Sequence, residues 1–226
     1  TESQAENMVD INEIIEVLNK LTPNIRSYRA GLDWSTGPGS VNKAESDTFM
    51  GYMLVSLYLE LPVRNELASL IYITKRDYNA VPMDNRQNYF IDNGKDGAEI
   101  IRHKYKTAAN HGPIIIKLEK PLTLLLRSWI KYRNISKKIV LDDPNYIFPD
   151  LQPRKDAEVS TAELNLTKNL NRFFTLYLGK KISTTLLAKI TIRSKIDPDT
   201  LKFLALAATK RGTSMGVIAN IYSGIS

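Results

Sequence analysis

The sequence predicts an α+β fold that is mostly helical, with a small three-stranded antiparallel sheet. Apolar residues recur at helical spacing over several long stretches, whereas β-branched and aromatic runs are short and gather between residues 71 and 118. A chain of 226 residues with 43% hydrophobic content can bury one substantial core. We therefore expect an N-terminal helix and linker over residues 1–44, followed by one main domain over residues 45–226.

The first seventy residues predict three helices. Residues 8–21 carry apolar side chains at helical spacing, and Pro23 is expected to lie beyond the end of that helix. A second helix is expected from about Asp47 to Pro62. A third helix is expected directly after Pro62, because proline favours helix starts, and it exposes Arg64 in its first turn. The apolar stripe of the second helix consists of Phe49, Met50, Met53, Leu54 and Leu57.

The middle of the chain predicts the sheet. Four short stretches rich in β-branched or aromatic residues are separated by polar turns, such as residues 92–97. We expect them to form an antiparallel sheet of about three strands. The stretches are residues 71–74, 88–91, 99–105 and 113–118.

The second half of the chain returns to helical patterning. Apolar residues from Leu122 to Ile130 line one face of a helix, and residues 142–154 are loop-like around Tyr146-Ile147-Phe148-Pro149. Four further helices are expected, over residues 161–178, 183–193, 198–208 and 215–222.

Composition favours a polyanionic partner and argues against a metal site. The chain has 31 Lys and Arg against 24 Asp and Glu, a net charge of +7 and a pI near 9.4, although a solvated surface alone explains such an excess equally well. It has no cysteine and only two histidines, so we expect no metal and no cofactor. No apolar run is long enough to cross a bilayer, so no membrane partner is expected.

Three side chains have the types needed to break a DNA phosphodiester: Arg64, Lys106 and Tyr222. A tyrosine nucleophile needs cations on the non-bridging phosphate oxygens and an acid for the departing hydroxyl. An arginine fork binds two phosphate oxygens, and a lysine on a strand turn can deliver the proton. Each residue also has a simpler interpretation, as a solvated arginine, a lysine that protects a hairpin edge, or a packing tyrosine.

Two upstream segments resemble the catalytic domain of the tyrosine recombinases. Residues 61–70, which read Leu-Pro-Val-Arg-Asn-Glu-Leu-Ala-Ser-Leu, resemble the segment that carries the first arginine of this family. Tyr105-Lys106-Thr107, followed by Gly112 and a strand, resembles the family's lysine hairpin. By this resemblance Arg64 is a phosphate clamp and Lys106 a general acid, with Lys104 as the substitute on the same strand face.

Two downstream segments extend the resemblance to residues 45–222. Residues 146–149 resemble the short strand or loop that follows the next helix of the family, and Gly212-Thr213-Ser214 with Tyr222 resembles its closing motif and nucleophile. The chain is similar in style to recombinase-like proteins of large eukaryotic viruses and mobile elements. This implies the recombinase catalytic-domain fold, a DNA partner and an intracellular location such as the nucleus or a viral replication site.

Several positions depart from the family's pattern. The family has its second arginine in a Leu-Arg-His run; one register puts Leu187-Ala188-Lys189 there and lacks the arginine, and another puts Ile192-Arg193-Ser194 there and keeps it. Neither register supplies the histidine, and Thr213 stands where a further histidine is expected. Glu66 follows Arg64 by two positions instead of three. Because one missing preorganised donor commonly costs about 3 kcal/mol of transition-state stabilisation, we expect impaired or absent catalysis.

Three functions remain open from the sequence. The first is a DNA-binding protein of the tyrosine recombinase family that is catalytically impaired or inactive. The second is an active recombinase that works through a 3′-phosphotyrosine intermediate, with Tyr222 as nucleophile, Arg64 and Arg193 as the phosphate clamp and Lys106 as general acid. The third is an unrelated helical nucleic-acid-binding protein of nucleocapsid type. In the first two cases the resemblance implies self-association on DNA, and we expect backbone contacts from Lys104, Lys189, Arg211 and Thr213.

Overall fold

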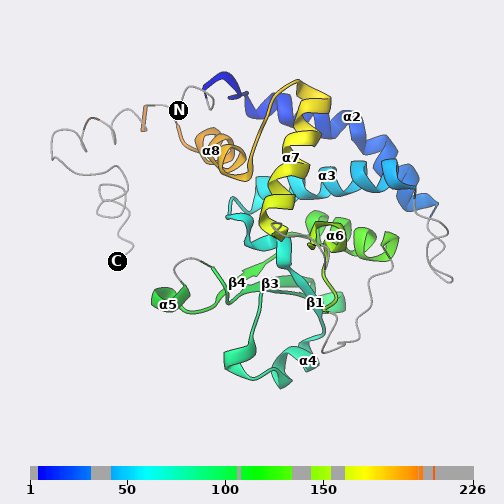
Figure 1. The fold of residues 1–226 in the computed structure, drawn as a ribbon, viewed down its shortest axis with the longest axis vertical. Helices are drawn as coiled ribbons and strands as arrows, with labels where there is room; N and C mark the ends of the chain where they lie inside the picture. The colour runs from blue at the N-terminus through cyan, green and yellow to red at the C-terminus, as the bar shows by residue number, and fades with distance from the viewer. Residues whose placement is uncertain are drawn as a thin grey trace.

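Helices cover one face of a small sheet in the computed structural model, and a short helix, α4 (Lys75–Ala80), lies on the other face (Figure 1). The structure describes residues 5–31, 42–105, 108–133, 144–153, 161–197, 199–200 and 206. This mostly helical architecture with one small sheet was predicted from the sequence. None of the described helices is long and apolar enough to cross a membrane.

The first long helix, α2, spans Ile11–Ala30, which corrects the expected end before Pro23. Its start is fixed by a capping box: the Asp10 carboxylate accepts from a backbone amide of the first turn, and the Glu13 carboxylate accepts from the Asp10 amide. Pro23 removes one helical hydrogen bond but does not end the helix. Ile25, beyond the proline, is buried in the core, so tertiary packing outweighs the local cost.

The central helix, α3, spans Lys43–Glu60 and is buried on most of its surface. The predicted apolar stripe lies in the core, as expected. Gly51 allows helix α7 (Ala162–Leu178) to approach closely, because a β-carbon there would come within 2.1 Å of the Phe173 ring. The predicted third helix is instead a short 3-10 helix, η1, over Asn65–Ser69. Only a few residues separate Pro62 from the next strand, so a longer helix has no room.

The sheet has four strands of mixed direction, which corrects the expected three antiparallel strands. Strands β2, β3 and β4 run antiparallel in sequence order, but β1 pairs with β2 in parallel. The cause is the connection between them, which contains α4 (Lys75–Ala80) and the 3-10 turn η2 (Met83–Asn85) and returns the chain to its starting end. The strands are β1 Ile71–Ile73, β2 Tyr89–Asp92, β3 Ala98–Arg102 and β4 Ile114–Lys117.

The connections after β2 and β3 are short. A 3-10 turn, η3 (Gly94–Asp96), joins β2 to β3, and Arg127 holds it by donating to the Asp92 carboxylate at 2.6 Å. A short helix, α5 (Ala108–His111), lies between β3 and β4.

The helix α6 spans Lys120–Tyr132 and anchors the loop that follows it. The Trp129 indole is fully buried and donates to the Ile147 carbonyl oxygen at 2.7 Å. One residue earlier, Tyr146 forms a single antiparallel bridge with Ile71 of β1. The predicted strand or loop at residues 146–149 is therefore one bridge, followed by a 3-10 turn, η4, over Pro149–Leu151.

The two later helices match their prediction. Helix α7 spans Ala162–Leu178, begins at the Thr161 cap, and ends at Gly179 in the left-handed conformation with φ of 66°. Helix α8 spans Thr184–Lys195. The helices expected over residues 198–208 and 215–222 lie outside the described residues, apart from positions 199, 200 and 206, which are helical.

The sheet separates two apolar clusters of different size. The larger cluster joins α2, α3, α6, α7 and α8 to one sheet face, including Tyr72 and Phe90. The smaller one lies on the opposite face beneath α4 and contains Ile73, Tyr78, Tyr89, Ile91 and Ile101. Helices α2, α3, α6, α7 and α8 thus form one body on one side of the sheet, and α4 lies on the other side (Figure 1).

Candidate nucleic-acid interface

Arg64 lies in extended backbone just before η1, and its side chain is exposed. The hydroxyl of Tyr58, on α3, donates to the Arg64 carbonyl oxygen at 2.8 Å and fixes the backbone there. Burial and the nearby Glu66 carboxylate raise the pKa of Tyr58, so this phenol stays protonated and remains a donor. The Arg64 guanidinium forms no ion pair with another residue that the structure describes.

Asn65 joins the Arg64 segment to two helices. Its side-chain nitrogen donates to the Thr167 hydroxyl of α7 at 3.1 Å, and its side-chain oxygen accepts from the Thr184 hydroxyl. Thr184 is the first residue of α8. The start of α8 is therefore fixed beside Arg64, although the two lie more than a hundred residues apart in sequence.

An ion pair joins the same segment to the sheet. Arg102, the last residue of β3, donates to Glu66 of η1 at 3.3 Å, and both side chains are largely buried. The Arg102 guanidinium also lies over the Tyr105 ring, 4.9 Å from its centre. Glu66, whose spacing departs from the family's pattern, thus has a structural partner. The end of β3, which leads towards Lys104 and Lys106, is held against the Arg64 segment.

Asn88 fixes the backbone at Lys104. Its side-chain oxygen accepts from the His103 amide at 2.9 Å and from the Lys104 amide at 2.8 Å. Its side-chain nitrogen donates to the Lys104 carbonyl oxygen at 2.8 Å. Asn88 is 5% exposed, so these bonds are shielded from water. The Lys104 side chain itself is exposed.

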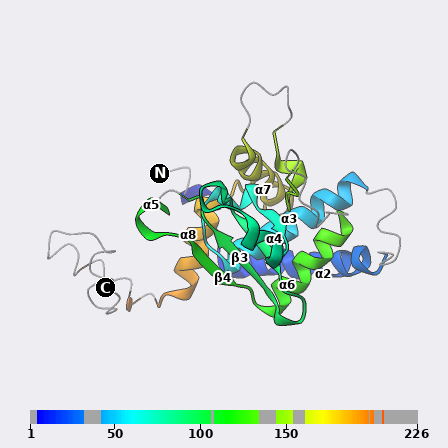
Figure 2. The same ribbon diagram turned by 90° about the horizontal axis from the view of Figure 1, so that it is seen from below.

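Helix α8 presents basic residues on its exposed face. Lys189 and Arg193 are four residues apart, so they share one side of the helix, and both are exposed. Leu186, Leu187 and Ile190 face the core. Either register considered for the second arginine therefore puts an exposed basic side chain on the same face. Figures 1 and 2 both place α8 and α5 on the same side of the molecule.

His103 lies in a chain of hydrogen bonds beside the end of β3. Arg86 donates to the Tyr78 hydroxyl at 3.1 Å, and that hydroxyl is 3.0 Å from the His103 Nε2 atom. A neutral His103 with an unprotonated Nε2 can accept from this hydroxyl. Burial and the Arg86 charge both lower the pKa of His103. The fold therefore favours neutral His103.

We expect acid to destabilise the protein through His103. The pKa of His103 is lower in the folded chain than the unfolded value of about 6.5, so the folded state binds the proton more weakly than the unfolded state. The contribution of His103 to the free energy of unfolding is therefore highest above that pH and falls as the pH drops below it. Urea unfolding at pH 7.5 and pH 5.5 measures the effect. The free energy of unfolding should fall less on acidification in His103→Gln than in the parent; an equal fall in both proteins would contradict the assignment.

The comparisons with known proteins give one structural likeness. No family model matches the sequence, and no curated protein matches it. Among solved structures, the chain is similar to the Tn1549 transposon integrase in complex with transposon right-end DNA, with 18% identity and a TM-score of 0.36. The match covers 76% of this chain, which spans 59% of that chain's length. So low a TM-score does not establish a shared fold.

The structure groups some of the predicted site residues and leaves others outside its description. The segments that carry Arg64, Lys104 and the α8 pair meet around η1, through Asn65 and the Glu66–Arg102 ion pair. Among the described residues, no group of three or more His, Asp or Glu side chains is arranged to hold a metal. The predicted residues outside the described part are Lys106, Arg211, Thr213 and Tyr222.

The sequence did not identify the residues that connect these segments. Asn65, Asn88 and Arg102 make the connecting bonds, and none was singled out. The only available signals were polar residues in apolar surroundings: Asn88 and Arg102 both occur in stretches expected to be strands. Their partners lie 15 to 36 positions away, so spacing alone does not reveal them.

Proposed function

We propose that this protein binds DNA through its phosphate backbone, as a tyrosine-recombinase-like protein with impaired catalysis. The observation that carries the proposal is the junction at η1. Bonds from Asn65 and Glu66 bring the Arg64 segment, the end of β3 with Lys104, and the start of α8 together. Three segments that meet at η1 thus each carry exposed basic side chains, and a surface that binds a phosphate backbone needs such residues.

Impaired catalysis is supported by the residues that replace the expected ones. Ala188 and Lys189 occupy the place of an arginine and a histidine in one register, and Thr213 occupies the place of a histidine. A lysine is a single point charge and does not reproduce the bidentate fork of an arginine on a phosphate. The loss of one such donor corresponds to roughly a 100- to 1000-fold lower rate.

DNA binding is tested by fluorescence anisotropy with a short labelled duplex at several salt concentrations. We expect log affinity to fall linearly with log salt. Arg64→Ala and Lys104→Ala should each weaken binding about ten-fold at low salt, as expected for one charge-assisted contact, and lower the salt slope by about 0.9. Circular dichroism should show that both variants remain folded.

Lys95→Ala is the matched control for Lys104→Ala. Lys95 is an exposed lysine of the turn η3, which precedes the other end of β3, roughly 20 Å away. We expect it to bind duplex DNA like the parent. No duplex binding at low salt would refute the proposal, and so would an equal loss in Lys95→Ala and Lys104→Ala.

The active recombinase is the second candidate, favoured by the position of Tyr222 relative to the Gly-Thr-Ser segment at residues 212–214. A nicked suicide substrate distinguishes it, because an active enzyme forms a covalent protein–DNA adduct that survives denaturing electrophoresis. An adduct that is absent in Tyr222→Phe would show catalysis and overturn the impaired assignment. Salt-sensitive binding without an adduct would support it.

An unrelated nucleocapsid-type protein is less well supported. That alternative predicts no small sheet beside Arg64, whereas β3 is joined to the Arg64 segment by the Glu66–Arg102 ion pair.

A further inference from the structure

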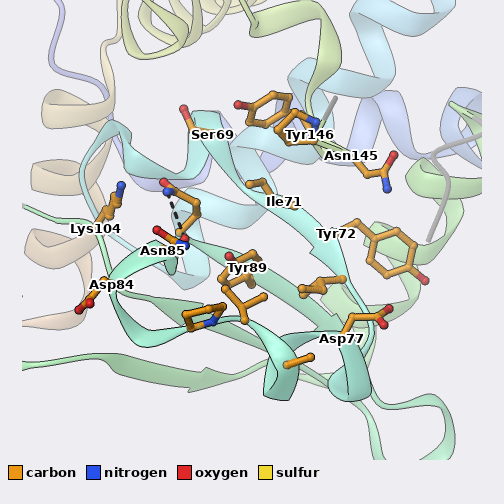
Figure 3. Close-up of a pocket in the computed structure, with 16 residues that line it drawn as sticks. Ser69, Ile71, Tyr72, Asp77, Asp84, Asn85, Tyr89, Lys104, Asn145 and Tyr146 are labelled. Atoms are coloured by element: carbon orange, nitrogen blue, oxygen red, sulfur yellow. Dashed lines mark hydrogen bonds between the residues drawn. The ribbon is translucent and has the colours of Figure 1, made fainter. Parts of the chain in front are cut away.

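A cavity of about 770 Å³ opens on the sheet face opposite the helical core (Figure 3). Its floor includes Ile71 of β1 and Tyr89 of β2. One wall is the α4–η2 segment, and the other is the stretch that contains Tyr146. Lys104 lies at one end, near Asn85. The cavity has the size of a small-ligand site and adjoins the proposed DNA-binding surface, with which it shares Lys104.

The lining combines flat apolar surface with amide groups. The half-buried Tyr146 contributes an aromatic ring, whereas Tyr89 is 4% exposed and only closes the floor. Side-chain amides come from Asn85, Gln87 and Asn145. An amide both donates and accepts, as the edge of a nucleobase requires, and aromatic rings stack on bases of any sequence. The Asn85 side chain has no hydrogen-bond partner among the described residues, so it can bond to a ligand.

The charges in the cavity favour a base over a phosphate in its interior. Asp77 and Asp84 line it alongside a single cation, Lys104. Two carboxylates repel a phosphate group placed between them, whereas they accept hydrogen bonds from exocyclic amines. Figure 3 places Lys104 and Asp84 at one end of the cavity and Asp77 at the other. Lys104 is the cation of the lining, so it is the side chain that can bind the phosphate attached to the same nucleotide.

Hydrogen bonds hold the walls of the cavity in place without a ligand. Arg86 donates to the Val81 carbonyl oxygen at 3.3 Å and to the Tyr78 hydroxyl at 3.1 Å, which fixes the α4–η2 segment. Asn88 fixes the backbone of Lys104. A cavity formed in advance loses less conformational entropy when a ligand enters.

We propose that this cavity binds the base of one unpaired DNA nucleotide, with Lys104 on the phosphate of that nucleotide. The inference rests on the proposed DNA-binding function and specifies its substrate as DNA with an unpaired base. Bases leave the helix most easily where they are mismatched, bulged or single-stranded, and pockets that take them combine stacking with hydrogen bonds to the base edge.

The test compares a duplex with the same duplex carrying one bulged 2-aminopurine. We expect the bulged DNA to bind about ten-fold more tightly, a ratio typical of one stacked base. The 2-aminopurine fluorescence should change on binding, because its stacking partners change. Ala80→Trp fills the cavity from α4 and should abolish the preference while it leaves duplex binding unchanged. Asn79→Trp is the matched control, because Asn79 is the neighbouring exposed residue and does not line the cavity.

A second variant, Asn85→Ala, keeps the test decisive if Ala80→Trp does not fold. It removes an exposed amide from the wall and should lower the preference for the bulge about three-fold, the effect of one neutral hydrogen bond. Equal affinity for both DNAs, or an unchanged preference in folded Ala80→Trp or in Asn85→Ala, would overturn the inference and leave the proposed function intact. Absence of binding to either DNA would overturn the proposed function itself.

Discussion

Gly51→Ala should destabilise the protein by about 2 kcal/mol. The new β-carbon would lie 2.1 Å from Cδ2 of Phe173 and 2.8 Å from its Cε2. The ring cannot swing aside freely, because Phe174 and Tyr177 flank it at centroid distances of 5.5 and 4.8 Å. Overpacking of this kind costs up to about 3 kcal/mol, whereas the better helix propensity of alanine returns about 1 kcal/mol. Urea unfolding measures the difference.

Gly31→Ala is the control for this substitution. Gly31 ends α2 with φ of −74°, and a β-carbon there would lie 3.6 Å from its nearest neighbour, an ordinary contact distance. We expect a change within about 0.5 kcal/mol. Adding Phe173→Leu to Gly51→Ala should recover part of the loss. If Gly51→Ala unfolds at the same urea concentration as Gly31→Ala, α3 and α7 do not approach as closely as described.

Asn88→Ala should lower the free energy of unfolding by about 3 kcal/mol. It removes three hydrogen bonds to the backbone of His103 and Lys104 in a shielded position. Two backbone amides and one backbone carbonyl then lose their hydrogen-bond partner, and each unsatisfied buried group costs about 1–3 kcal/mol. Water that enters the space left by the side chain can bond to these groups and offset part of that cost. Hydrogen exchange locates the effect, because the Lys104 amide should exchange much faster in the variant.

The same variant should weaken DNA binding at least as much as Lys104→Ala. Without Asn88, the end of β3 loses the bonds that position Lys104 beside the Arg64 segment. Asn12→Ala is a suitable control, since Asn12 is exposed on α2, and its stability and binding should match the parent. Unchanged unfolding together with slow exchange at the Lys104 amide would contradict the positioning role of Asn88.

Capping residues and helical spacing predicted the helices correctly where tertiary packing favours the same ends. Helix α7 begins at the Thr161 cap and ends at Gly179, and both ends are marked by residues that cap helices in any context. The same reasoning failed at Pro23, where the local preference opposes a helix but Ile25 gains burial in the core. The helix propensity of a residue is a weak preference that tertiary contacts override. The length of α2 therefore depends on contacts that the spacing of residues in the sequence does not show.

The direction of β1 also depended on information that the strands do not contain. A β-branched run has the same pattern in a parallel and an antiparallel pair. The connection between β1 and β2, which contains α4, determines that they are parallel. It carries the chain back to the end of the sheet where β1 begins, and β2 starts from there. A six-residue helix is too short to leave a clear periodicity.

For the site, the sequence by itself determined the chemical types: Arg64, Lys104 and the basic residues of α8, together with the net positive charge that favours a polyanionic partner. Only the tertiary structure decided which of them lie together. Asn65, Asn88 and the Glu66–Arg102 ion pair join η1, β3 and α8 across long sequence separations. The physical reason is that charge and propensity belong to single residues, whereas a hydrogen bond between distant segments exists only after the chain has folded.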